Sequence, residues 1–194
     1  HAFRGKRGGF GKRVLGEGWV SHWGHHKREA CRGIIEPGAE KDSILNGVTD
    51  VFADSDVYEA HPPKDVKILL RGLVLENMKP DSKPSTRDRK KDRPINDPAM
   101  ATAWTRNYKW TSGKTSKIFC TTMGAATDLQ SEGLRRMIVN ATYAGLGMEV
   151  PRKANVDYVD PYKPLFYGFN SFRRGIKPSD HALGKILPAG TKKK

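Results

Sequence analysis

Three stretches of the chain carry the hydrophobic patterns of β-strands. Residues 66–75 (VKILLRGLVL) are rich in β-branched and aliphatic side chains, which favours a buried strand. Residues 99–108 (AMATAWTRNY) alternate between two faces and predict a second strand. Residues 116–123 (SKIFCTTM) follow the turn signal TSGK and predict a third. We expect the last two strands to form an antiparallel pair joined by a loop of several residues.

The best helical pattern lies at residues 131–146. Leu134, Met137, Ile138 and Ala141 stand at positions i, i+3, i+4 and i+7, which places them on one face of a helix. This spacing predicts an amphipathic helix that packs on a core through that face.

The remaining segments show weaker patterns. Residues 10–19 are broken by glycines and hold at most a short helix, and residues 32–50 are typical of loop and turn. Past residue 150 the chain is rich in proline and lacks periodicity. We therefore expect a domain at 1–150 and an extended, basic, irregular tail at 151–194. Three or four strands with one helix cannot cover both faces of a sheet, which suggests that an N-terminal part is missing.

Composition narrows the possible partners. The chain has 35 Lys and Arg against 21 Asp and Glu, a formal net charge of +14, and such an excess favours anionic partners. The basic run at 83–93 (KPSTRDRKKDR) also contains acids and is bracketed by prolines, so we interpret it as a solvated loop. Nucleic-acid binding is the weaker alternative. No run of 18 apolar residues exists, so we expect no membrane insertion.

The two cysteines do not define a redox environment. Cys31 and Cys120 lie 89 positions apart, and nothing in their spacing demands a disulfide. Cys120 falls in an apolar strand pattern, where a thiol usually behaves as a small buried hydrophobe.

The densest candidate chemistry is the stretch SHWGHHK at 21–27, which holds His22, His25 and His26, half of the chain's six histidines. Imidazoles can bind a divalent metal, but adjacent histidines diverge in most backbones. The alternatives are a polar loop that faces a substrate and a structural hydrogen-bonded cluster. The indole of Trp23 could pack on the C–H face of a sugar, and a histidine could move a proton at a sugar oxygen.

Several segments together resemble the trehalose-utilisation (ThuA-like) family, in particular a planctomycete-type branch. The residues that carry the resemblance are His1-Ala2-Phe3, Gly9-Phe10-Gly11 through Trp19, His22-Trp23-Gly24-His25-His26, Ile44-Leu45-Asn46-Gly47-Val48, Asp56-Val57-Tyr58, Ala103-Trp104-Thr105-Arg106, Ile118-Phe119-Cys120-Thr121-Thr122-Met123-Gly124, Leu134-Arg135-Arg136 to Asn140, and Lys177-Pro178-Ser179-Asp180-His181. Their order and spacing, rather than any single motif, carry the match.

The resemblance implies an α/β fold: a flavodoxin-like, class I glutamine amidotransferase-like sheet, N-terminally truncated here because its first βα units would precede His1. It also implies carbohydrate catabolism, acting on trehalose-related or modified glycosides, and an exported or periplasmic bacterial protein whose leader is absent. Asp56 and Tyr58 match the acidic-x-Tyr element of such proteins, near the expected ligand cleft.

Two departures from related proteins limit the chemistry. Neither cysteine stands at a strand-to-helix elbow, so a Cys-dependent glutamine amidotransferase is not expected. Many ThuA-like proteins carry a histidine after the glycine that ends a strand similar to residues 118–124, and this chain has Ala125.

We therefore expect a hydrolase or isomerase-type enzyme of carbohydrate metabolism, or a non-catalytic sugar-binding or scaffolding module; polyanion binding is a weaker third possibility. The expected partner is a small-molecule carbohydrate. The candidate catalytic residues are His22, His25, His26 and Asp56, and the candidate substrate-binding residues are His1, Trp23 and Tyr58. No cofactor is predicted, although the three histidines at 22, 25 and 26 could hold a divalent metal.

Overall fold

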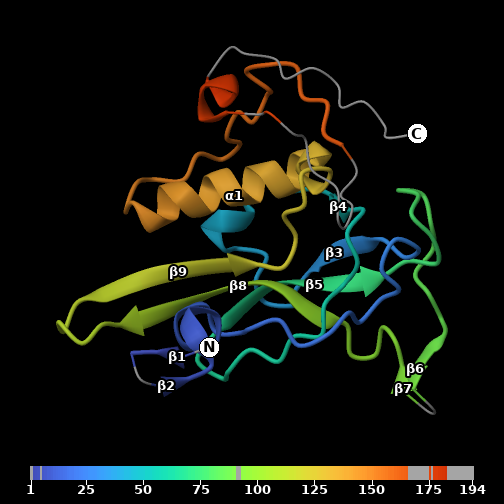
Figure 1. Ribbon diagram of the computed structural model, residues 1–194, viewed down its shortest axis with the longest axis horizontal. Coiled ribbons are helices and arrows are strands. Elements are labelled where there is room, and N and C mark those ends of the chain that lie inside the picture. The colour runs from blue at the N-terminus through green and yellow to red at the C-terminus, as the bar shows by residue number, and fades with distance from the viewer. Residues whose placement is uncertain (1, 5, 91–92, 166–174, 176, 183–194) are drawn as a thin grey trace.

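A curled, five-stranded antiparallel sheet forms the centre of the molecule (Figure 1). The computed structural model describes residues 2–4, 6–90, 93–165, 175 and 177–182. In the order in which they pair, the strands are β4 (Val51–Ala53), β3 (Cys31–Ile35), β5 (Lys67–Val74), β8 (Met100–Lys109) and β9 (Thr115–Thr121). The sheet curls into a half-barrel, and the larger hydrophobic cluster joins strand residues such as Leu70 and Ala103 to the helix residues Leu134 and Met137.

Shorter elements surround this sheet. Two small ribbons pair β1 (Ala2–Phe3) with β2 (Lys6–Arg7) and β6 (Asp88–Lys90) with β7 (Arg93–Pro94). The helical elements are the π-helix η1 (Gly11–Leu15), the 3₁₀ turns η2 (Ser43–Leu45), η3 (Asp128–Gln130) and η4 (Pro178–His181), and the helix α1 (Glu132–Gly145).

Helix α1 confirms the pattern at 131–146 and covers one side of the sheet (Figure 1). Ser131 caps its start, because its hydroxyl accepts a hydrogen bond from the amide of Leu134 at 3.4 Å. Its residues Leu134 and Met137 are fully buried. Gly133 lets the first turn approach β4 closely: a Cβ atom there would lie 1.7 Å from the carbonyl oxygen of Asp50.

The expected flavodoxin-like, class I glutamine amidotransferase-like α/β sheet is wrong. All pairings within the five-stranded sheet are antiparallel. Parallel neighbours need a crossover connection between them, usually a helix. Among the described residues the one α-helix, α1, follows the last strand, so it connects no two strands of the sheet. The periodicity of each segment indicated strands correctly, but it carries no information about their direction.

The three predicted strands are confirmed as β5, β8 and β9, and the last two form the expected antiparallel hairpin. Strand β3 was missed because turn residues dominate the segment 32–50. Gly33 lies inside β3, where a Cβ would come within 3.1 Å of Val51 and 3.2 Å of Leu70. Close packing between β3 and its neighbours thus explains why a glycine stands at this position. The same glycine made the strand harder to recognise in the sequence.

The segment after α1 returns across the side of the helix that faces away from the sheet (Figure 1). The guanidinium of Arg135 donates to the carbonyl of Val156 at 3.0 Å, and Arg136 donates to Ala154 at 3.1 Å. The described segment 151–165 contains no helix or strand. No helix in the described part of the chain is long and apolar enough to span a membrane.

Candidate functional site

The histidine-rich stretch runs beside residues 57–59 as an extra, irregular strand. The amides of Trp23 and Gly24 both donate to the carbonyl of Val57, at 2.8 and 3.1 Å, and His22 forms an isolated antiparallel bridge with Tyr58. The amide of Glu59 donates to the carbonyl of Ser21 at 2.9 Å. These backbone bonds fix the position of His22 relative to Asp56.

A second set of contacts closes the stretch into a tight turn. The carboxylate of Glu29 accepts a hydrogen bond from the amide of His25 at 2.6 Å and binds Arg87 through both oxygens, at 2.6 and 2.7 Å. Burial alone raises the pKa of Glu29, but the bonds from Arg87 and from the His25 amide outweigh it and hold this pKa below its ordinary value. Arg89 also donates to the carbonyl of His22 at 3.0 Å. The basic run at 83–93 is therefore not simply solvated, because two of its arginines support this loop.

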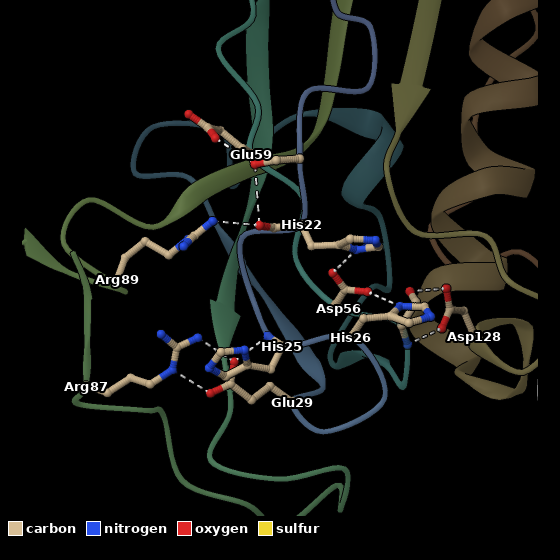
Figure 2. A network of polar contacts seen from close by, with 11 residues as sticks. His22, His25, His26, Glu29, Asp56, Glu59, Arg87, Arg89 and Asp128 are labelled. Atoms are coloured by element: carbon tan, nitrogen blue, oxygen red, sulfur yellow. Dashed lines mark hydrogen bonds and ion pairs between the residues drawn. The ribbon is translucent and has the colours of Figure 1, made fainter.

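The centre of the site is the buried carboxylate of Asp56, which binds two imidazoles (Figure 2). The side chain of Asp56 is 1% exposed, and its two oxygens lie 2.7 Å from Nδ1 of His22 and 2.8 Å from Nδ1 of His26. A carboxylate oxygen can only accept, so each Nδ1 must carry a proton and donate it. Their ring centroids are 4.8 Å apart. Asp56 thus fixes the position of both rings and holds a proton on each Nδ1.

Aromatic side chains flank His22. Tyr58 meets it edge-on with ring centroids 5.6 Å apart, and Trp19 does so at 5.7 Å. Trp19 is 66% exposed, so most of its indole is open to solvent. Burial, followed by the negative charges of Asp56 and Asp128, raises the pKa of Tyr58. The phenol is therefore a hydrogen-bond donor at neutral pH.

A second buried carboxylate, Asp128, lies next to this centre (Figure 2). It accepts hydrogen bonds from the amides of Gly124 and Ala125, both at 2.9 Å, and from the amide and hydroxyl of Ser55, at 3.0 and 2.6 Å. Burial and the nearby Asp128 raise the pKa of Asp54, against the opposing bond from Thr127. Asp128 joins the loop after β9 to the loop after β4.

Both thiols are poor nucleophiles in this environment. Burial, with added repulsion from Asp128 and Asp56, raises the pKa of Cys31 far above its ordinary value. Burial raises the pKa of Cys120 to about 11. Both cysteines are free. Thiolate chemistry is therefore not supported at either position.

The other predicted site residues lie away from Asp56 or outside the described part. The exposed His25 lies beside Glu29 and Arg87 rather than at Asp56 (Figure 2). Trp23 is 3% exposed, and its indole donates to the carbonyl of Ile95 at 2.8 Å. It supports the loop from within instead of facing a ligand. The prediction for His1 concerns a residue outside those that the structure describes.

Trp19 is a residue that sequence reasoning did not select. It precedes His22 by three positions, and it follows Gly16 and Gly18 at the end of the segment 10–19. An aromatic residue in such a polar, glycine-rich stretch has few neighbours with which to form a core. This feature of the sequence could have indicated that Trp19 is exposed and available to a ligand.

Two hollows of the described surface lie elsewhere. One of about 180 Å³ is lined by residues that include Ala60, His61, Arg71 and Met100, and one of about 300 Å³ lies near Glu36–Ala39 and Val66–Ile68. Neither is lined by His22, His26 or Asp56. The two imidazoles are nevertheless accessible from solvent, because the side chain of His22 is 38% exposed and that of His26 is 20% exposed.

Three ligand-capable side chains meet at this surface: the ligand atoms of His22, His26 and Asp56 lie within 4.8 Å of one another. Such a set can transfer protons or hold a metal ion. Scans of family models, curated proteins and solved structures found no match to this chain, so the function must be inferred from the site itself.

Proposed function

We propose that this protein acts on a carbohydrate, and that the imidazoles of His22 and His26, oriented by Asp56, transfer protons at its hydroxyl or carbonyl oxygens. The observation that carries the proposal is the buried carboxylate with an imidazole on each oxygen, at 2.7 and 2.8 Å. A carboxylate bonded to Nδ1–H positions the ring and stabilises the imidazolium that forms when the ring takes up a proton.

His22 is the better candidate for direct proton exchange. Its side chain is 38% exposed, against 20% for His26. With Nδ1 committed to Asp56, the nitrogen of His22 that can exchange a proton with a ligand is Nε2. We assign His26 a supporting role: it shares the carboxylate of Asp56 with His22 and thereby affects how strongly that carboxylate acts on His22.

The carbohydrate class rests on two kinds of support. The exposed indole of Trp19 offers an apolar surface beside a set of hydrogen-bonding groups, which suits the C–H and O–H faces of a sugar. The motif resemblance to ThuA-like proteins points to trehalose-related or modified glycosides. The antiparallel sheet contradicts the fold which that resemblance implied, so the proposed class of ligand depends on the motifs and the side chains alone.

A test compares purified protein against keto-sugars and plain disaccharides, measuring turnover by product analysis and binding by calorimetry. We expect turnover or saturable binding of one class, reduced at least tenfold in His22→Gln and unchanged within about twofold in the matched control His25→Gln. Trp19→Ala should weaken affinity without altering the fold, because its ring is exposed. Equal loss in both histidine variants, or no response to any sugar, would refute the proposal.

A non-catalytic sugar-binding module is the second candidate. It is favoured by Ala125, a methyl group where many of the resembled proteins carry a histidine, and by the absence of a reactive thiol at Cys31 or Cys120. Saturable sugar binding without turnover, lost in His22→Gln, would select this candidate over the enzyme.

A further inference from the structure

We infer that His22, His26 and Asp56 form a binding site for a divalent first-row transition-metal ion of the zinc type. This inference rests on the proposed function, because the ion would occupy the same centre. With the ion bound, His22 would serve as a ligand, and an open coordination position would face the sugar in place of proton exchange at this ring. The three side chains come from two segments, 22–26 and 56, that are remote in sequence and are joined by backbone hydrogen bonds.

The ligand set has the chemistry of a catalytic rather than a structural metal site. Two imidazoles and one carboxylate are donors that zinc and its neighbours accept, and catalytic zinc sites use three protein ligands with a fourth position left for water or substrate. Ligands of a tetrahedral zinc ion are about 3.3 Å apart, given metal–nitrogen distances of about 2.0–2.1 Å. The observed atoms lie within 4.8 Å of one another. For the ion to bind, the rings must turn and exchange their hydrogen bonds to Asp56 for bonds to the metal.

Buried negative charge also favours a cation at this position. Asp56 and Asp128 are 4% and 1% exposed. The hydrogen bonds and ion pairs found for Asp56 within the described residues join it to imidazoles, and those found for Asp128 join it to amides, a hydroxyl and the carboxyl of Asp54. No lysine or arginine among the described residues forms an ion pair with Asp56 or Asp128. A bound dication would compensate negative charge at this position.

The loop that carries both histidines is already held in place. Glu29 and Arg87 fix the turn through His25, and Arg89 fixes the carbonyl of His22. The buried indole of Trp23 lies between the two histidines in sequence and anchors the loop to Ile95. An ion that binds here orders little additional chain, which increases its affinity.

The experiment titrates tag-free, chelator-treated protein with Zn²⁺ alone, in competition with a chromophoric chelator. We expect one ion per chain. His22→Ala, His26→Ala and Asp56→Asn should each weaken zinc binding at least about tenfold. The matched control is His25→Ala, an exposed histidine of the same loop, for which we expect a change below about twofold. Circular dichroism of each variant checks that it folds, and Co²⁺ absorption in the folded variants reports the coordination sphere directly.

Absence of stoichiometric zinc binding would overturn the inference, as would an equal loss in His25→Ala, which marks binding by scattered surface histidines. Sugar binding is measured in parallel with chelator and with zinc. If the protein binds sugar but shows no zinc site, the inferred metal site is wrong and the proposed function stands. Stoichiometric zinc binding without any sugar response has the opposite meaning: the metal site stands and the proposed function fails.

Discussion

Two buried carboxylates lie side by side in this molecule and have opposite surroundings. Asp128 accepts four hydrogen bonds, from three backbone amides and one hydroxyl. Asp56 accepts two, both from imidazoles. The four donors around Asp128 are backbone amides and a hydroxyl of fixed loops, with the carboxyl of Asp54 beside them. The donors around Asp56 are imidazoles, which can also switch tautomer or bind a metal ion.

This difference separates a structural role from a chemical one. A carboxylate surrounded by amides stabilises the loops that supply them, and its loss leaves those amides unsatisfied. A carboxylate shared by two imidazoles can respond to protons, metals and ligands, since each ring can switch tautomer or leave. We expect substitutions at the two positions to have correspondingly different effects on stability and on binding.

The largest effect is expected from Asp128→Ala. Removing this side chain leaves up to four buried donors without a partner, and we expect the free energy of unfolding to fall by about 4 kcal/mol. The matched variant Asp56→Ala should lose only about 1–2 kcal/mol, because the partly exposed imidazoles can turn to water. Urea unfolding followed by circular dichroism measures both. An equal decrease in the free energy of unfolding for the two variants would contradict the distinction between a structural Asp128 and a chemical Asp56.

A smaller effect is expected from Glu29→Gln. This change weakens the bidentate pair with Arg87, which is partly exposed, and should reduce stability at neutral pH by about 1–2 kcal/mol. The folded state lowers the pKa of Glu29, so its stabilisation is present above the ordinary value of 4.5 and is lost as pH falls through the lower folded value. The difference between wild type and variant should therefore shrink below about pH 4.5. A difference that stays constant into acid would contradict this assignment.

The smallest effect on stability is expected from Asp56→Asn, within about 1 kcal/mol. One imidazole can still donate to the amide oxygen, and the other can switch tautomer and accept from the amide nitrogen. Binding at the site should nevertheless be lost, because the negative charge is gone. Thermal unfolding and zinc or sugar titration on the same sample separate the two effects. If Asp56→Asn were strongly destabilised, Asp56 would have a structural role like that of Asp128.

Local patterns in the sequence predicted the local structure well and the topology poorly. The segments at 66–75, 99–108 and 131–146 each carry a periodicity that one element imposes on its own residues. Strand direction depends instead on which segments pair, and the short β3 and β4 are recognisable only through their partners. The expected flavodoxin-like sheet came from the family resemblance rather than from these patterns, and the antiparallel pairings contradict it.

The residues of the candidate site could be predicted only in part from the sequence. The density of histidines pointed to His22 and His26, and the acidic-x-Tyr element pointed to Asp56. Adjacent side chains such as His25 and His26 diverge along an irregular backbone, so the sequence did not show which of them faces Asp56. The burial of Trp23 and the exposure of Trp19 depend on the remote residues around them.

The most direct test of the account is the protonation of the ring nitrogens of His22 and His26, measured by long-range ¹H–¹⁵N correlation NMR on chelator-treated protein at about pH 8. The geometry at Asp56 predicts that both rings carry a proton on Nδ1 and that both signals change in Asp56→Asn. The signals of the exposed His25 should not respond to this substitution. An unprotonated Nδ1 in His22 or His26 would contradict the shared carboxylate, and with it the assignment of this centre as the functional site.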